Sequence, residues 1–161
     1  MNTLNINYDF FCAKFNRSVD TSLPEGYFGS HHHADYELLF VVKGSGTFLI
    51  EDSSFEFTDG ALFLIPPGIY HVLQTPPQGG YDRFVINFSS ELIPSSVTIS
   101  NFFHKHADSA TWSLFMKFYE YTERFGKDKL ETLFSSFLSE ILVLVTTDGA
   151  LEGSEGAGLP D

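Results

Sequence analysis

Residues 60–71 read GALFLIPPGIYH, and this stretch decides how the rest of the sequence is interpreted. The run 61–65 is short and apolar, as a buried β-strand is. A glycine precedes it and Pro-Pro-Gly follows it, and these residues interrupt regular structure. The chain resumes an apolar pattern at 70–74, which contains His71. We therefore expect a strand, a turn and a second strand that carries His71.

Further short apolar segments separated by turns occur on both sides of this unit. Leu4–Phe10 alternates apolar and polar residues, which is typical of a half-buried strand. Tyr36–Val42 is almost continuously apolar and ends in a Lys-Gly-Ser-Gly turn. Other strands are expected at 47–51, 55–57 and 84–88. Short strands at this regular spacing predict an all-β barrel or sandwich.

The hydrophobic period changes from two to 3.6 after about Ser100, which predicts two helices. The first carries Trp112, Phe115, Met116 and Tyr119 and is expected to end at Gly126. Asp128 and Glu131 have the spacing of a capping box and are expected to start the second helix.

The second helix carries an apolar stripe that must be buried against something. Its members are Leu130, Leu133, Phe134, Phe137, Leu138, Ile141, Leu142 and Val145. The stripe could pack on its own barrel, or it could form a dimer seam. The stripe is wide enough to do both. Phe134, Leu138, Ile141 and Val145 could face one partner, while Leu130, Phe137 and Leu144 face the other.

Composition and charge narrow the class of protein. The chain has 161 residues, of which 43% are hydrophobic and 16% aromatic, so it can build one well-filled core. Nine basic and 21 acidic residues give a net charge of -12, which opposes direct binding to a phosphate backbone. The single cysteine, Cys12, cannot form an internal disulfide. No signal peptide or membrane span is apparent, so we expect a cytoplasmic protein without a membrane partner.

Three potential metal ligands lie where the strand at 36–42 begins. His31, His33 and Glu37 are separated by even numbers of residues, so on a strand their side chains share one face. His71 is the expected fourth ligand. Imidazole and carboxylate suit a divalent cation such as zinc, nickel, manganese or iron. The alternative is that the four residues line a pocket without metal.

Two sequence motifs make the chain resemble the cupins. Gly60, Pro66, Gly68 and His71 reproduce the second cupin motif, G-x5-P-x-G-x2-H, at full spacing. The first motif is represented by His31, His33, Glu37 and Gly44. Its leading glycine, Gly26, lies one residue too close, and Thr75 stands where the second motif has asparagine. These two departures leave the ligand positions unchanged.

Within the cupins, residues 25–147 resemble the sensor domain of AraC-type transcription regulators. The matching stretches are 31–48, 63–71, 81–83 and 86–89, and that family follows its barrel with two helices. The resemblance implies a mainly β fold, a cupin double-stranded β-helix (jelly-roll) barrel followed by two α-helices. We expect the barrel and an N-terminal strand or arm at 1–100, the helical pair at 101–147 and a flexible tail or linker at 148–161.

The resemblance also implies a function. The domain would bind a small effector, such as a sugar, in the barrel and form a homodimer through its C-terminal helices. Candidate effector contacts are Tyr81 and Arg83, together with His31, His33, Glu37 and His71. DNA would be contacted only through a C-terminal helix-turn-helix domain, which these 161 residues do not include. On this interpretation the chain is not an enzyme.

The alternative is a stand-alone metal-dependent cupin enzyme, such as a dioxygenase or a sugar isomerase. The same four residues would then bind the metal and leave one coordination position open for substrate. This alternative leaves the second helix unexplained. The segment Tyr8–Phe15 is expected to be a lid over the barrel or an ordinary edge strand, and His104 and His106 are expected to be solvated.

Overall fold

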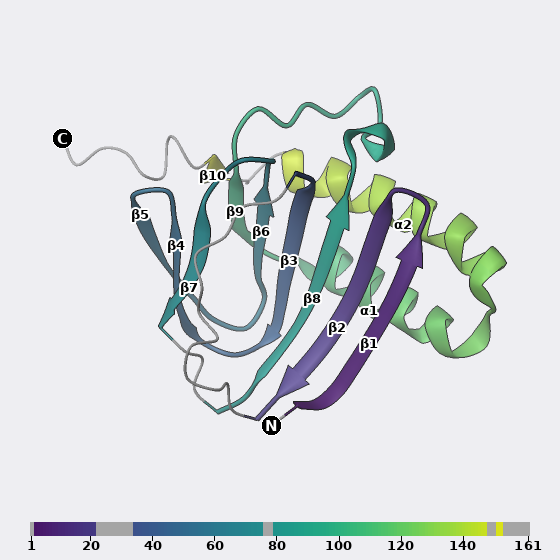
Figure 1. Ribbon diagram of the computed structural model, residues 1–161, viewed down its shortest axis with the longest axis horizontal. Helices are drawn as coiled ribbons and strands as arrows, with labels where there is room; N and C mark the ends of the chain where they lie inside the picture. The colour runs from purple at the N-terminus through teal and green to yellow at the C-terminus, as the bar shows by residue number, and fades with distance from the viewer. Residues whose placement is uncertain (1, 22–33, 76–78, 148–150, 153–161) are drawn as a thin grey trace.

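The computed structural model describes residues 2–21, 34–75, 79–147 and 151–152. Two antiparallel sheets face each other, and two helices cover the outer face of the larger sheet (Figure 1). The larger sheet has the order β1-β2-β8-β3-β6-β9-β10, and the smaller sheet has the order β5-β4-β7. The strands are β1 (Asn2–Phe10), β2 (Ala13–Asp20), β3 (Tyr36–Lys43), β4 (Gly46–Ile50), β5 (Ser53–Phe57), β6 (Ala61–Ile65), β7 (His71–Thr75), β8 (Tyr81–Phe88), β9 (Phe103–His106) and β10 (Leu151–Glu152).

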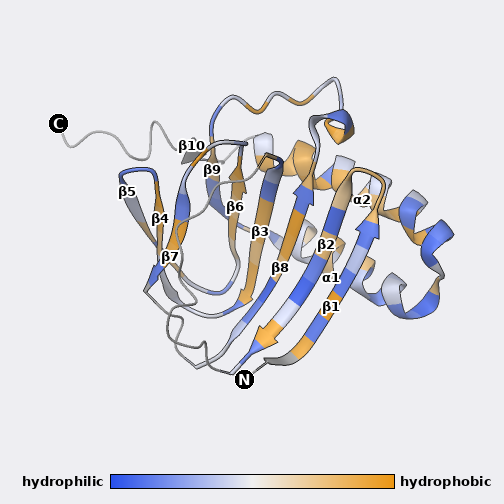
Figure 2. Ribbon diagram, in the orientation of Figure 1, coloured by the Kyte–Doolittle hydropathy of each residue, from blue (hydrophilic) through white to orange (hydrophobic). Residues whose placement is uncertain are grey.

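The central strands β3, β6 and β8 are buried on both faces, and Figure 2 shows them as the most hydrophobic strands of the larger sheet. Because side chains alternate along a strand, each contributes to two separate cores. The barrel core, between the two sheets, contains Leu39, Val41, Phe48, Ile50, Phe57, Ala61, Phe63, Ile65, Leu73, Tyr81 and Phe102. The helix-side core takes the alternate residues, including Leu38, Phe40, Leu62, Leu64, Phe84, Ile86 and Phe88.

The fold predicted from the sequence is confirmed in its class and in its main strands. The structure is mainly β with two α-helices after strand β9, and the buried strand at 61–65 has the predicted bounds. Strands β2 and β9 were not predicted, because their polar residues leave no clean apolar alternation. Strand β9 lies in the segment assigned to the helical pair and pairs with β6. Of the predicted tail at 148–161, only β10 is among the described residues.

The N-terminal segment is an edge strand and not a lid. Strands β1 and β2 form a hairpin at the edge of the larger sheet, and β2 pairs with β8. The hairpin turns at Phe11 and Cys12, where Cys12 has a positive φ of 57°. The carbonyl of Cys12 accepts a 2.9 Å hydrogen bond from the N–H of Ser89. This bond ties the hairpin turn to the chain that follows β8.

The two helices begin with different caps. Helix α1 (Ser109–Arg124) starts after Asp108, whose carboxylate accepts the N–H of Thr111 at 2.9 Å. Helix α2 (Lys127–Thr146) starts after Gly126, which makes no side-chain cap bond. The predicted capping box is therefore wrong. The Glu131 carboxylate instead accepts the N–H of Phe11 at 3.1 Å and holds the β1–β2 hairpin against α2.

The predicted division of the α2 stripe between two partners is also wrong. Of the residues assigned to it, all but one are buried within this single chain. Those buried are Leu130, Phe134, Phe137, Leu138, Ile141 and Val145, all in the helix-side core. Leu144 is half-buried, and Val143 is the large apolar residue of α2 that is exposed. The physical reason is that the larger sheet has its own apolar outer face, which the stripe must cover.

Neither of the two described helices is long and apolar enough to cross a membrane.

Phe134 tests the burial of the stripe. Its ring lies 4.7 Å from that of Phe10 and 5.6 Å from that of Phe118. We expect Phe134→Ala to lower the free energy of unfolding by about 3–5 kcal/mol, because it leaves a cavity in the helix-side core. Ser135→Ala, at an exposed position of the same helix, is the control and should change it by less than about 0.5 kcal/mol. Urea denaturation measures both, and similar values would contradict the placement of the stripe.

Candidate functional site

Four of the six predicted site residues are described by the structure, and all four lie on the inner faces of the two sheets. Glu37 lies on β3, and Tyr81 and Arg83 lie on β8. His71 begins β7 in the opposite sheet, where it pairs with Ile50 of the barrel core. The other two predicted residues, His31 and His33, lie outside the described residues.

Glu37 and His71 meet across the barrel. His71 Nε2 lies 2.8 Å from Glu37 Oε2, and the two residues are 2% and 7% exposed. The other ring nitrogen, Nδ1, lies 2.9 Å from the carbonyl oxygen of Ile69. Because a carbonyl oxygen can only accept, Nδ1 carries a hydrogen and donates it. Nε2 is therefore the nitrogen that His71 turns toward the carboxylate.

The geometry of this pair fits two ligands of one cation. The contact has the distance of an ion pair without the alignment of a hydrogen bond. A histidine that binds metal through one nitrogen usually donates the other N–H to a carbonyl or carboxylate, as His71 does to Ile69. Within residues 2–21, 34–75, 79–147 and 151–152, no group of three or more potential ligands is placed to hold a metal.

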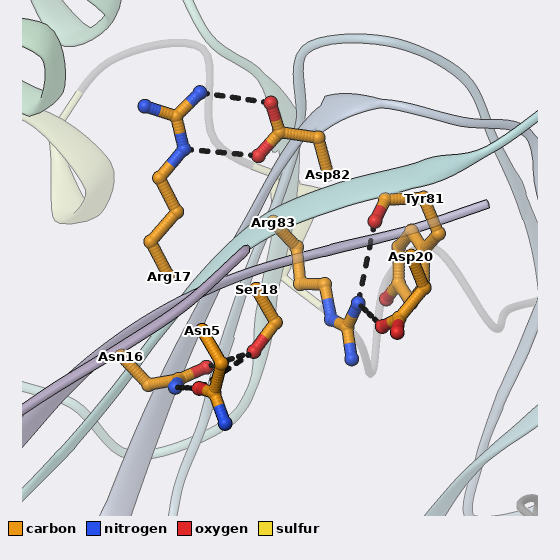
Figure 3. Close-up of polar contacts among 8 residues, drawn as sticks. All are labelled: Asn5, Asn16, Arg17, Ser18, Asp20, Tyr81, Asp82 and Arg83. Carbon is orange, nitrogen blue, oxygen red and sulfur yellow. Dashed lines mark hydrogen bonds and ion pairs between the residues drawn. The ribbon is translucent and has the colours of Figure 1, made fainter. Parts of the chain in front are cut away.

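Arg83 forms a second polar pair inside the barrel (Figure 3). Its Nη1 donates to the Asp20 carboxylate and, at 3.3 Å, to the carbonyl of Tyr81. The guanidinium carbon lies 4.4 Å from the centre of the Tyr81 ring. Arg83 is 6% exposed and Asp20 is 7% exposed, so this ion pair is buried and not on the surface. Asp20 therefore belongs to the candidate site, although the sequence did not indicate it because β2 was not predicted.

The neighbouring Asp82 points to the opposite face of β8. It forms a two-pronged ion pair with Arg17 of β2, with distances of 3.0 and 2.8 Å. The guanidinium also lies 4.4 Å from the centre of the Tyr119 ring on α1. The hydrogen bonds that Arg17 donates to Asp82 raise the pKa of Arg17 above its usual value. Arg17 and Asp82 thus connect the sheet to α1, while Arg83 and Asp20 face the barrel.

Asn87 is a further candidate site residue, which was not predicted from the sequence. It pairs in register with Glu37 on β3, and strand alternation places it on the same face as Val85, which packs on the barrel core. Its side-chain oxygen is buried and has no hydrogen-bond partner among the described residues. The signal for it in the sequence is that Asn87 lies between Ile86 and Phe88, whose side chains point to the other face of the strand. Asn87 offers an acceptor to any hydroxyl or amine donor that enters the barrel.

His104 and His106 lie on β9, and His104 is not solvated as predicted. Its ring stacks on Phe63 with centres 4.4 Å apart and an angle of 2° between the planes. It also meets the edge of Phe55 at 5.2 Å. Burial lowers the pKa of His104 below its usual value, and the charge of His106 adds to this effect. The folded protein therefore favours the neutral ring.

The lowered pKa of His104 predicts a dependence of stability on pH. The unfolded chain binds a proton at this position below about pH 6.5, while the folded chain resists it. The free energy of unfolding should therefore fall as the pH decreases from about 6.5 to 5.

We expect His104→Phe, which keeps a ring and removes the titration, to lessen this fall. Urea denaturation of both proteins across that range measures the difference, which isolates His104 from the other histidines. Parallel curves for the two proteins would contradict the prediction.

The family described as the AraC-like ligand binding domain matches residues 19–116. No relative was found among curated proteins. The matched segment contains β3 to β9 and most of the residues that face the barrel.

Two of the solved structures to which the chain is similar are described as cupins. One is an RmlC-like cupin from Methanocaldococcus jannaschii with a double-stranded β-helix fold, which is 20% identical with a TM-score of 0.43. That match covers 53% of this chain and 81% of the other. A second is a cupin from Bacteroides fragilis, 15% identical with a TM-score of 0.44, covering 57% of this chain and 81% of the other.

Proposed function

The chain belongs to the family of AraC-like ligand binding domains, and from this premise we propose that it is the effector-sensing and dimerising domain of a cytoplasmic transcription regulator. The observation that carries the proposal is the buried polar set inside an otherwise apolar barrel. Its described members are Ser18, Asp20, Glu37, His71 and Arg83, together with the buried side-chain oxygen of Asn87. Polar side chains are costly to bury, so several that face the inside of one barrel indicate a ligand site more than a packing core.

The proposed effector is a small polar metabolite such as a sugar. The site combines carboxylate acceptors, a guanidinium donor and the open acceptor of Asn87. A sugar hydroxyl both donates and accepts, so it can meet each of these groups. The Tyr81 ring and the apolar barrel core supply the nonpolar surface that a small ligand also requires.

A divalent cation fits the same site. Glu37 and His71 would hold it, and His31 and His33 would complete the ligand set. Such a cation would act as a Lewis acid toward a bound oxygen atom. In the regulatory role, Glu37 and His71 would orient the effector. Turnover of a bound sugar, with loss of metal and activity together in His71→Ala, would favour the metal-dependent enzyme instead.

Asn87 provides the test of the effector site. Native protein, purified without chelator, is titrated by calorimetry with a panel of aldoses and ketoses, and its metal content is measured. We expect saturable binding of at least one sugar without turnover. Asn87→Ala should weaken it roughly fivefold, because one hydrogen bond contributes about 1 kcal/mol.

Gln74→Ala is the control for this titration. Gln74 is an exposed amide on β7, so its loss should leave the affinity unchanged. A protein that binds no sugar and is a strict monomer would contradict the proposed function.

The proposed homodimer uses the solvent-facing side of the helical pair. A groove of about 710 Å³ lies between α1, α2 and the segment 94–96. Leu114, Val143 and Leu144 line it, with Lys117 and Glu140 among its polar groups. A two-fold interface pairs a surface with itself, so one cation and one anion in the same groove suit a second copy. DNA contact would require a further domain, because the net charge of this chain is -12.

Val143 tests the dimer surface, because it is 41% exposed in the groove. We expect Val143→Glu to shift the molar mass from dimer to monomer, since it places a charge in an apolar interface, and to leave the thermal midpoint nearly unchanged. Light scattering after size exclusion measures the mass. Tyr70→Glu is the control, because Tyr70 is 51% exposed and precedes β7 in the sheet that carries no helix. Val143→Glu protein that remains dimeric would exclude this surface.

A further inference from the structure

Four rings form a continuous stack across the barrel, from His71 through Phe48 and Phe63 to His104. The His71 and Phe48 ring centres are 6.0 Å apart with 15° between their planes. Phe48 and Phe63 are 5.1 Å apart at 24°, and Phe63 and His104 are 4.4 Å apart at 2°. We call these four residues the ring stack. It begins in the candidate site and ends on β9, in the opposite sheet.

Strand β9 connects the end of the ring stack to both helices. His104 faces the barrel, whereas the next residue, Lys105, donates from Nζ to the carbonyl of Leu144 at 3.2 Å. This carbonyl belongs to the last turn of α2, where backbone acceptors have no helical partner. The residue after β9, Ala107, donates its N–H to Gly60 at 2.8 Å, and Asp108 then caps α1.

The chain that follows α2 returns to the same strand. Strand β10 pairs with β9, with Leu151 opposite His104 and Glu152 opposite Phe103. Strand β9 therefore contributes His104 to the ring stack, donates a hydrogen bond to the C-terminal turn of α2, and pairs with strand β10. No other described strand joins the barrel core to the end of α2 by a side-chain hydrogen bond.

We propose that the ring stack and β9 couple the state of the barrel site to the C-terminal end of α2. The inference rests on the proposed function for the identity of the site. It adds the residues through which a change at that site would reach the end of α2. A displacement of His71 has to move Phe48 and Phe63, because close-packed rings leave no free volume to absorb it. His104 and Lys105 are neighbours on a pleated strand, so a shift of His104 also moves Lys105 and changes its hydrogen bond to the carbonyl of Leu144.

The test changes the site and observes the far end of α2. Glu37→Gln removes the charge that faces His71 and keeps the volume of the side chain. Hydrogen exchange of the amides at 142–146 is measured in the full chain, together with the NMR shifts of the His104 ring. We expect exchange in this turn to change about fivefold, and the His104 resonances to move.

Two variant proteins distinguish transmission through the ring stack from a general effect of loosening the barrel core. Phe63→Leu interrupts the stack in its middle, and there the response to Glu37→Gln should be lost. Phe57→Leu is the matched control, because Phe57 is also buried in the barrel core but is not in the stack, so the response should persist. Should Phe63→Leu fail to fold, His104→Leu interrupts the stack at a half-buried position, and His104→Phe should restore the exchange response.

An equal response in the native and interrupted backgrounds would overturn the proposal. A folded Glu37→Gln chain with no response at α2 would also overturn it. The assay adds no effector and no metal, so it gives an answer whether or not the chain binds a sugar. Failure of the sugar titration therefore counts against the proposed function, and failure here counts against the coupling.

Discussion

Burial of β3, β6 and β8 on both faces is the constraint on which the rest of this structure depends. Each of these strands supplies alternate residues to two cores, so neither face of the larger sheet can remain in water. The smaller sheet covers one face, and the helices cover the other. The apolar stripe of α2 is buried against the larger sheet, so the side of the helix left for solvent or a partner carries small and polar residues together with Val143 and Leu144.

The same constraint explains how the polar groups are placed. The Glu37 carboxylate faces Nε2 of His71 at 2.8 Å. Because a charge on the inner face of the barrel cannot reach bulk water, Asp20 and Arg83 are held together as a buried ion pair. Such pairs contribute little net stability, because the cost of removing both charges from water offsets their attraction. Their presence inside an apolar barrel is better explained by recognition of a ligand. Asn87, with its open acceptor, agrees with this interpretation.

Much of the fold could be predicted, because strand alternation and turn residues are local properties. The strand at 61–65 and the turn at Gly44 follow from a few neighbouring residues each. Predictions about side chains that contact residues distant in the sequence were wrong in two places. Glu131 has the spacing of a capping residue, yet it accepts the N–H of Phe11 because the hairpin lies beside α2. His104 sits in a polar stretch, yet it is stacked on Phe63 because β9 joins the sheet next to β6.

The sequence by itself determined the class of fold, the family and the approximate position of the site, since spacing of His71 after Gly60, Pro66 and Gly68 is readable without coordinates. Only the tertiary structure decided which residues meet. It brought Glu37 to His71 from two sheets and Asp20 to Arg83 from two strands, and it turned the α2 stripe inward. The physical reason is that contacts between residues distant in sequence depend on strand order and sheet packing, which no local pattern records.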